Sequence, residues 1–153
     1  MFDKFHRIPG RLASREKFKE TVMPEAEVAG QIIPAPISVL PLLNQGEIFL
    51  GVYCGPDGEL IRVILLPEEK ASSSWKSAMK WAKDLGGDLP IRIEQAMLFA
   101  YLRDEFRREW YWSNQLADFG DAYAWYQNFD YGTQEYSYPD SKLRARAVRR
   151  SPI

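Results

Sequence analysis

Hydrophobic and polar positions in the middle of the chain predict a β-hairpin followed by two helices. Residues 47–67 hold two runs of β-branched and aromatic residues around Gly55-Pro56-Asp57-Gly58, which is typical of a short reversal between strands. In residues 72–87 apolar side chains recur at helical spacing after a serine cluster and before Gly86-Gly87, so we expect a capped amphipathic helix. Residues 93–106 predict a second helix, whose middle is apolar nearly all round and must be covered on several sides.

Short alternating segments in the last third of the chain predict a β-meander. Asp130-Tyr131-Gly132 forms the expected turn between its second and third strands. In the last strand, small apolar residues alternate with arginines, which predicts one apolar and one mostly cationic face. The order of elements indicates an α+β fold with the helices on one side of an antiparallel sheet. The four expected strands are residues 109–113, 122–129, 133–138 and 143–149.

The first 43 residues differ in pattern from the remainder. Four prolines between residues 24 and 41 argue against a long helix or a central strand, and only residues 12–22 carry a thin apolar helical stripe. We therefore expect an extended N-terminal arm, residues 1–43, and one domain, residues 44–153. The arm is expected to pack on its own domain or on a neighbouring subunit, giving a homo-oligomer, or to be a poorly ordered terminus.

Composition narrows the class of protein. The 153-residue chain has a formal net charge of -1 and a pI of about 5.9, so it offers no basic field for nucleic acid or anionic lipid. Its start is charged and lacks the apolar region of a secretory signal, and no run of residues is long enough to cross a bilayer. A single cysteine excludes an intramolecular disulfide and fits a reducing compartment. We expect a soluble protein made in the cytoplasm.

The residues needed for catalysis are scarce. His6 is the only histidine and Cys54 the only cysteine, so neither a nucleophile with a histidine base nor a Cys/His zinc site is expected. We expect Cys54 to be a small buried hydrophobe and not a reactive thiol. Acidic residues could still pair for glycoside hydrolysis, although a solvated surface is the commoner fate of such residues. They are Asp104, Glu105, Glu109, Asp118, Asp121, Asp130 and Glu135. We predict a non-enzymatic protein without a cofactor or metal.

A series of short motifs then runs in a fixed order through the second half of the chain: Trp75, Ala78, Ala82, Leu85-Gly86-Gly87, Leu89-Pro90, Glu94, Tyr111-Trp112-Ser113, Ala124-Trp125, Phe129, Gly132 and Arg146-Ala147-Val148-Arg149. Together these motifs resemble the Lcl C-terminal domain family of bacterial, prophage and phage proteins. The resemblance covers residues 74–150. It implies a C-type-lectin-like fold and a binding role on cell or phage surfaces.

Two residues depart from that family's pattern, and both lie at the start of the second helix. Asp88 stands where the family has arginine, and Ile91 stands where it has threonine. Arg92 is the candidate for the missing cation. The catalytic relatives of this fold use reactive cysteines, and one cysteine near a turn does not reproduce their arrangement. The arginines of the last strand look like ion-pairing partners for the acidic residues upstream, although phosphate contact is the alternative.

The densest aromatic block, residues 110–138, supplies the candidate binding surface. Trp112, Trp125 and Phe129 alternate with polar residues, so we expect them to face the core. Tyrosines in the block are expected to include outward or loop members, which give a large contact area at low entropic cost. The predicted partner surface is Asn114, Asp118, Asp121, Tyr126, Tyr131 and Tyr136. Ordinary surface tyrosines are the alternative, and calcium held by Asn114, Asp118 and Asp121 is a weaker one because the spacing does not match the lectin signature.

These observations lead to two hypotheses on function. The first is a C-type-lectin-like binding or structural module, encoded by a phage or prophage, that recognises a protein or glycan as a virion or surface component and is fastened by its arm. The second is a small intracellular phage inhibitor or regulator that binds a host protein or a nucleoprotein complex. The two differ in location, since the first predicts a place in the virion.

Overall fold

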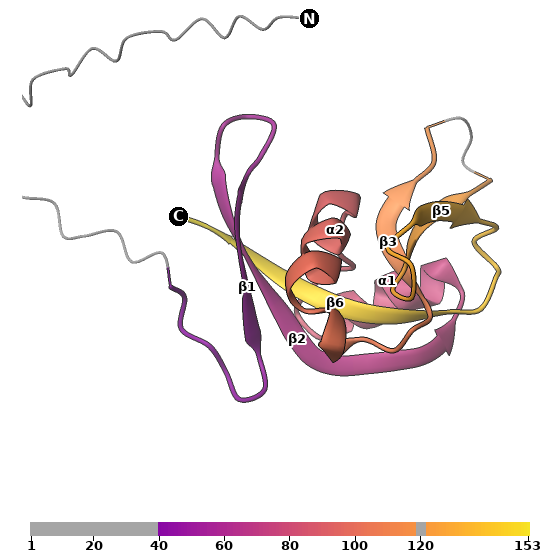
Figure 1. Cartoon of the computed structure of the whole chain (residues 1–153), viewed down its shortest axis with the longest axis horizontal. Coiled ribbons are helices and arrows are strands. Elements are labelled where there is room, and N and C mark those ends of the chain that lie inside the picture. The colour runs from indigo at the N-terminus through magenta and orange to yellow at the C-terminus, as the bar shows by residue number, and fades with distance from the viewer. Residues whose placement is uncertain (1–39, 119–121) are drawn as a thin grey trace, which may run out of the picture. The chain divides into compact units, whose positions relative to one another are not determined.

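The computed structural model of the protein describes residues 40–118 and 122–153 (Figure 1). The predicted arm, apart from residues 40–43, and Asp121 of the predicted partner surface lie outside these residues. Within them the fold is α+β, with two α-helices, one short 3-10 helix and six strands. In chain order these are β1 (Ile48–Cys54), β2 (Leu60–Ser73), α1 (Trp75–Asp84), α2 (Arg92–Tyr101), η1 (Arg103–Glu105), β3 (Trp110–Leu116), β4 (Ala124–Asn128), β5 (Gln134–Ser137) and β6 (Leu143–Pro152).

The predicted hairpin is confirmed. β1 pairs antiparallel with β2, and Cys54 lies opposite Leu60 at the reversal. Gly58 has a φ of 81°, the left-handed conformation that the Asp-Gly pair supplies. A bulge between Phe49 and Gly51 shifts the register of β1, so the strand does not alternate regularly along its length.

The first helix is also confirmed, and the glycines after it close the helix as predicted. Gly86 has a φ of 78° and donates its N–H to the carbonyl of Lys83 at 2.9 Å, while Gly87 donates to the carbonyl of Ala82 at 3.0 Å. These two bonds form a Schellman motif. Ser74 occupies the N-cap, but its side chain makes no capping hydrogen bond. The C-terminus of α1 therefore has a hydrogen-bonded cap, whereas the side chain of its N-cap serine makes no capping hydrogen bond.

The predicted meander and the antiparallel sheet are wrong at the last strand. The sheet order is β1-β2-β6-β3-β4-β5, so β3, β4 and β5 form a meander but β6 leaves it and returns between β2 and β3. β6 pairs antiparallel with β2 and parallel with β3, where Tyr111 lies opposite Arg144. The sheet is therefore mixed. Both faces of β6 carry side chains that need covering, which a central place in the sheet provides and an edge place does not.

The two helices cover opposite faces of the sheet, in contrast to the predicted single side (Figure 1). On one face, the small apolar residues of β6 pack with two alanines of α1. On the other, Val148 packs with Leu65 of β2 and Leu98 of α2. The α1 face comprises Leu66, Ala78, Ala82, Leu89, Trp112, Ala124, Tyr126, Leu143, Ala145 and Ala147. Adjacent residues of β3 show the same division, since Trp112 belongs to the first cluster and Tyr111 to the second.

The predicted core aromatics are confirmed in two of three cases. Trp112 and Phe129 are fully buried, whereas Trp125 is half-buried. The ring of Phe129 stacks on Phe106, with ring centroids 3.9 Å apart. Tyr111 is buried beside this pair, and its hydroxyl donates to the carboxylate of Glu69. Burial, together with that hydrogen bond, raises the pKa of Tyr111. In the part of the chain that the structure describes, no helix is long and apolar enough to cross a membrane.

Candidate functional site

A pocket of about 280 Å³ lies at one end of the sheet. Because β3 and β6 are parallel, both begin at this end, and their antiparallel neighbours β4 and β2 finish there. The lining residues come from these four strand ends and from the turn after β4. They are Ala71, Arg108, Glu109, Trp110, Asn128, Asp130, Tyr131, Lys142, Leu143 and Arg144. The return of β6 into the sheet therefore builds the pocket.

Two exposed aromatic residues contribute to the pocket lining. The side chain of Trp110 is 51% exposed and that of Tyr131 is 77% exposed, values high for rings of this size. Trp110 packs on Tyr126, with ring centroids 6.0 Å apart, and so has support on one side. Partly supported aromatic rings with an open face are a common means of binding a partner.

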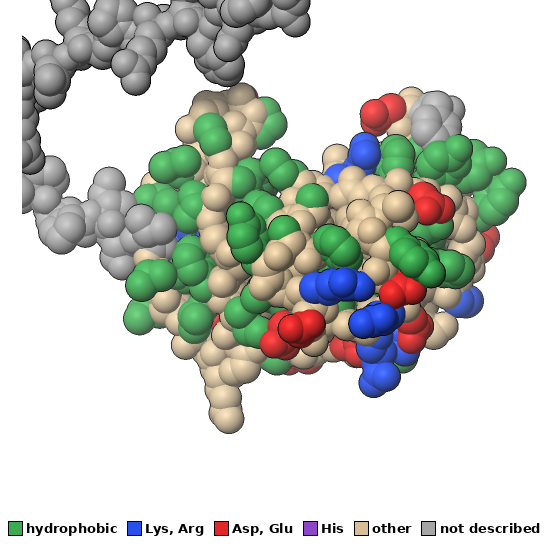
Figure 2. Space-filling view, viewed as in Figure 1, with side chains coloured by type: hydrophobic (Ala, Val, Ile, Leu, Met, Phe, Trp, Pro, Cys, Tyr) green, Lys and Arg blue, Asp and Glu red, His purple; other side chains and the backbone are tan. Residues whose placement is uncertain are grey.

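Charged side chains of both signs surround these rings. Arg144 pairs with Glu109 at 2.9 Å and with Glu69 at 3.5 Å. The adjacent guanidinium of Arg144 lowers the pKa of the Glu109 carboxyl, which is therefore ionised at neutral pH. Arg108 approaches Asp130 at 3.8 Å, near the limit for an ion pair. Figure 2 shows basic and acidic side chains side by side over the connection from α2 to β3, next to hydrophobic ones.

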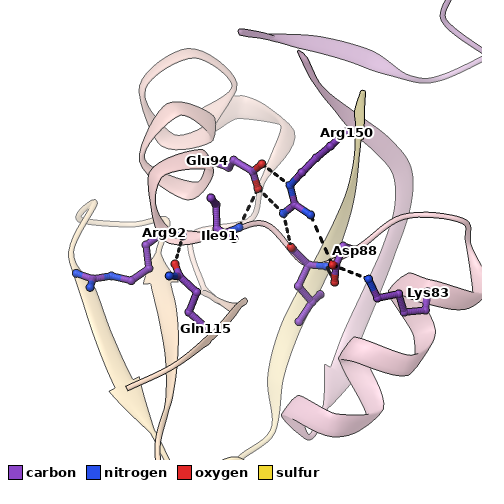
Figure 3. Close-up of polar contacts among 8 residues, drawn as sticks. Lys83, Asp88, Ile91, Arg92, Glu94, Gln115 and Arg150 are labelled. Atoms are coloured by element: carbon purple, nitrogen blue, oxygen red, sulfur yellow. Dashed lines mark hydrogen bonds and ion pairs between the residues drawn. The ribbon is translucent and has the colours of Figure 1, made fainter. Parts of the chain in front are cut away.

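A second polar cluster lies at the start of α2, and its charged side chains bond to one another (Figure 3). The guanidinium of Arg150 in β6 donates to both carboxylate oxygens of Glu94, each at 2.6 Å, and to the carbonyl of Leu89 at 2.9 Å. Glu94 is fully buried, and it also accepts the backbone N–H of Ile91 at 2.8 Å. Burial opposes the charge on Arg150, yet its bonds to Glu94 raise its pKa. We refer to Asp88, Glu94 and Arg150 as the helix-entry cluster.

The helix-entry cluster shows how Asp88 and Ile91 are accommodated before α2. Asp88 pairs with Lys83 at 2.6 Å and with Arg150 at 3.5 Å, so the cations beside it are Lys83 and Arg150 and not Arg92. Ile91 has no side-chain acceptor, and the first helical N–H, that of Arg92, donates instead to Gln115 of β3 at 2.7 Å. The start of α2 is thus capped by its own Glu94 and by Gln115 of β3.

Arg92 points away from the helix-entry cluster and lies over an aromatic ring of β4 (Figure 3). Its guanidinium is 3.7 Å from the ring centroid of Trp125. From Trp125 the ring contacts continue through Tyr136 at 5.6 Å, and from there to Tyr123 at 5.3 Å. Tyr138 follows at 4.9 Å from Tyr123. We name the residues Tyr123, Trp125, Tyr136 and Tyr138 the aromatic strip.

The structure separates the residues of the predicted partner surface. Tyr126 is buried on the α1 face, and burial and a hydrogen bond to Glu135 raise its pKa to about 12. Tyr136, which pairs with Trp125 in the sheet, lies on the other face. Tyr131 lies at the pocket. Asn114 is half-buried and Asp118 is exposed.

The sequence reasoning missed Trp110, Arg108 and Lys142. Their signal is an aromatic residue after a run of charges, Arg107-Arg108-Glu109, at the beginning of a strand. That signal alone does not say which other strand ends lie beside it.

The expectation that Cys54 is buried is wrong, because its side chain is exposed. It lies at the end of β1, where the hairpin reaches past the residues that α2 covers. The arginines of β6 do pair with acidic residues, and Arg149 bonds Glu47 at 2.7 and 2.8 Å. Arg146 is the exception, since it is buried and donates to the carbonyls of Leu66 and Glu105. Across residues 40–118 and 122–153 no group of three acidic, histidine or cysteine side chains is placed to hold a metal.

Comparison of the chain with models of known protein families and with curated proteins finds no match.

Proposed function

We propose that this chain is a non-enzymatic binding module with a C-type-lectin-like fold that recognises a protein or glycan partner as a phage or prophage surface component. The exposed aromatic strip carries the proposal. Its rings contact one another in series, and Tyr136 and Tyr138 are 47% and 62% exposed. Tyrosines held in this way present contact area that loses little conformational entropy on binding.

The order of the described elements supports the lectin-like part of the proposal. The motifs that resemble the Lcl C-terminal domain family fall on successive elements: Trp75 begins α1, Leu89-Pro90 leads into α2, and Tyr111-Trp112-Ser113 lies in β3. Ala124-Trp125 lies in β4, and the closing arginines lie in β6. The positions of these motifs on the elements agree with the pattern on which the resemblance rests.

Support beneath the strip favours recognition over a purely structural role. Arg92 stacks on Trp125 and hydrogen-bonds Gln134 through its Nε at 3.1 Å, while Gln134 donates to the carbonyl of Arg92 at 2.6 Å. These reciprocal bonds join the start of α2 to β5 and fix the orientation of the ring at one end of the strip. A surface already ordered in the free protein pays less entropy on binding.

The proposal is tested with a variant that changes both exposed tyrosines, Tyr136→Ser with Tyr138→Ser. Tyr101→Ser is the matched control, because Tyr101 is 74% exposed at the end of α2 and is not part of the strip. The immobilised full chain and both variants are incubated with purified phage particles, with host lysate and with a glycan array. We expect a partner that the full chain and the control retain and that the double variant loses.

Equal retention by all three proteins, or no retained partner, would contradict the strip as the recognition surface. The source of the retained partner separates the two functional hypotheses. A virion protein or surface glycan supports the surface component, whereas a host regulatory protein or nucleoprotein complex favours the intracellular inhibitor.

A further inference from the structure

The pocket at the strand ends is lined by charges of both signs, and its cations differ in how closely a carboxylate pairs with them. Three of its lining residues are cations, Arg108, Lys142 and Arg144, and two are carboxylates, Glu109 and Asp130. Arg144 is balanced by Glu109 and Glu69. Among residues 40–118 and 122–153, Lys142 makes no ion pair, and Arg108 has only its 3.8 Å approach to Asp130. Lys142 and Arg108 are therefore available to an anionic group of a ligand.

The aromatic residues define a second requirement for a ligand. Trp110 and Tyr131 expose ring surface beside the cations, and Leu143 and Ala71 add apolar atoms to the lining. A volume of about 280 Å³ holds one or two side chains, and it lies below the range usual for drug-sized ligands. The occupant must therefore combine a small apolar or aromatic group with a nearby negative charge.

We propose that this pocket binds a segment of a partner protein in which a large apolar side chain lies next to an aspartate or glutamate. The apolar side chain packs between Trp110 and Tyr131, and the carboxylate lies between Arg108 and Lys142. Charge complementarity selects this occupant. A bare phosphate could reach the cations but would leave both rings uncovered. A neutral saccharide would cover the rings but leave the two cations without a partner.

The pocket is independent of the aromatic strip. Asn128 at the pocket ends β4, whereas Tyr123 in the strip precedes the first residue of β4, and the two sites have no residue in common. Loss of one site therefore leaves the other intact, so failure of this proposal and failure of the proposed function give different results.

The test uses three synthetic peptides with blocked ends: Gly-Asp-Phe-Asp-Gly, its Gly-Asn-Phe-Asn-Gly analogue and Gly-Asp-Ala-Asp-Gly. Each is titrated into the full chain labelled with ¹⁵N, and the indole N–H resonance of Trp110 is followed by NMR after its assignment with Trp110→Phe. We expect the first peptide to bind with a Kd on the order of 1 mM. The two analogues should bind about tenfold more weakly or not at all, and higher salt should weaken the first peptide several-fold.

Three variants separate this site from others. Lys142→Gln should reduce binding of the acidic peptide about fivefold without affecting the asparagine analogue, because only the charge interaction is lost. Trp110→Ala, followed through the backbone amide resonances of the pocket residues because its indole is gone, should abolish binding of both, and Tyr138→Ser in the strip should change neither. Because Lys142 is exposed, Lys142→Gln should fold, and it can test the proposal even if Trp110→Ala does not fold.

The proposal is overturned if the acidic and asparagine peptides bind alike, or if Tyr138→Ser loses as much binding as Lys142→Gln. It is also overturned if glucuronic acid or inorganic phosphate shifts the Trp110 resonance at lower concentration than the peptide does. Those outcomes would indicate a saccharide or a simple anion as the occupant.

Discussion

The helix-entry cluster and the pocket each contain an arginine of β6, but the two arginines differ in their surroundings. β6 carries Arg150 to the first and Arg144 to the second, and each arginine binds carboxylates from other elements. In the cluster the carboxylate of Glu94 is fully buried and every partner belongs to the chain. At the pocket, the side chains of Glu109 and Arg108 are 53% and 77% exposed. The same kind of ion pair is therefore shielded from water in the cluster and open to solvent at the pocket.

Burial accounts for the difference. A charge removed from water must keep its partner, because an uncompensated buried charge costs several kcal/mol. An exposed pair contributes little to stability, since water and salt can replace either partner. We therefore expect changes in the helix-entry cluster to affect stability and changes at the pocket to affect binding.

The largest effect is expected for Glu94→Ala. This change leaves the guanidinium of Arg150 and the N–H of Ile91 without their acceptor. We expect a loss of about 3 kcal/mol in the free energy of unfolding, measured by urea denaturation. Lys80→Ala is the control, because its 2.7 Å pair with Asp84 is exposed, and it should cost less than about 0.5 kcal/mol. Similar losses of stability in the two variants would contradict the distinction between buried and exposed ion pairs.

A smaller loss is expected for Gly87→Ala, which tests how closely the α1–α2 connection approaches β6. A Cβ at Gly87 would lie 2.6 Å from the carbonyl oxygen of Val148, which already accepts the N–H of Asp88. We expect about 2 kcal/mol of destabilisation, measured by urea denaturation. Gly86→Ala is the comparison, because its φ is +78° but no atom lies within 4 Å of the new Cβ, and it should cost about 1 kcal/mol. A larger loss at Gly86 would show that backbone conformation matters more than this contact.

Acid should weaken a third arginine–carboxylate pair of β6, the partly buried pair of Arg149 with Glu47. The hydrogen bonds from Arg149 lower the pKa of Glu47 from 4.5 to about 2. A lowered carboxyl pKa contributes stability that is fully present above 4.5 and is lost as the pH falls toward 2.

Between pH 5.5 and pH 2.5 the unaltered chain should therefore lose about 1 kcal/mol more stability than Glu47→Gln. Urea midpoints at constant ionic strength measure this difference, since the other carboxyls titrate in both proteins. An equal loss would mean that Arg149 does not hold the carboxylate.

The smallest effect on stability is expected at the pocket. Lys142→Gln and Arg108→Gln should each change the free energy of unfolding by less than about 0.5 kcal/mol, because neither side chain is buried. Thermal unfolding followed by circular dichroism provides the check. A loss above about 1 kcal/mol from either change would show that the charges at the pocket stabilise the fold, contrary to their proposed role in binding.

Local patterns predicted the individual elements well. The Gly55-Pro56-Asp57-Gly58 reversal, the glycine end of α1 and the strand alternation around Ala145 each depend on residues close together in sequence. Because turn conformation, helix termination and side-chain alternation are set over a few residues, a single sequence is enough to infer them. The candidate site was not predicted as well. Tyr126 and Tyr136 fit one surface by composition, but sheet pairing places them on opposite faces.

The sequence by itself determined a hairpin, two helices and strands with one apolar and one cationic face in β6. Only the tertiary structure decided that β6 returns between β2 and β3, that the helices cover opposite faces, and that Trp110 and Lys142 line one pocket. The reason is physical. The alternation of side chains along a strand predicts which of them share a face, but not which strand is its neighbour. The neighbours of β6 are decided by the burial of both its faces and by the pairing of its arginines with carboxylates distant in the sequence.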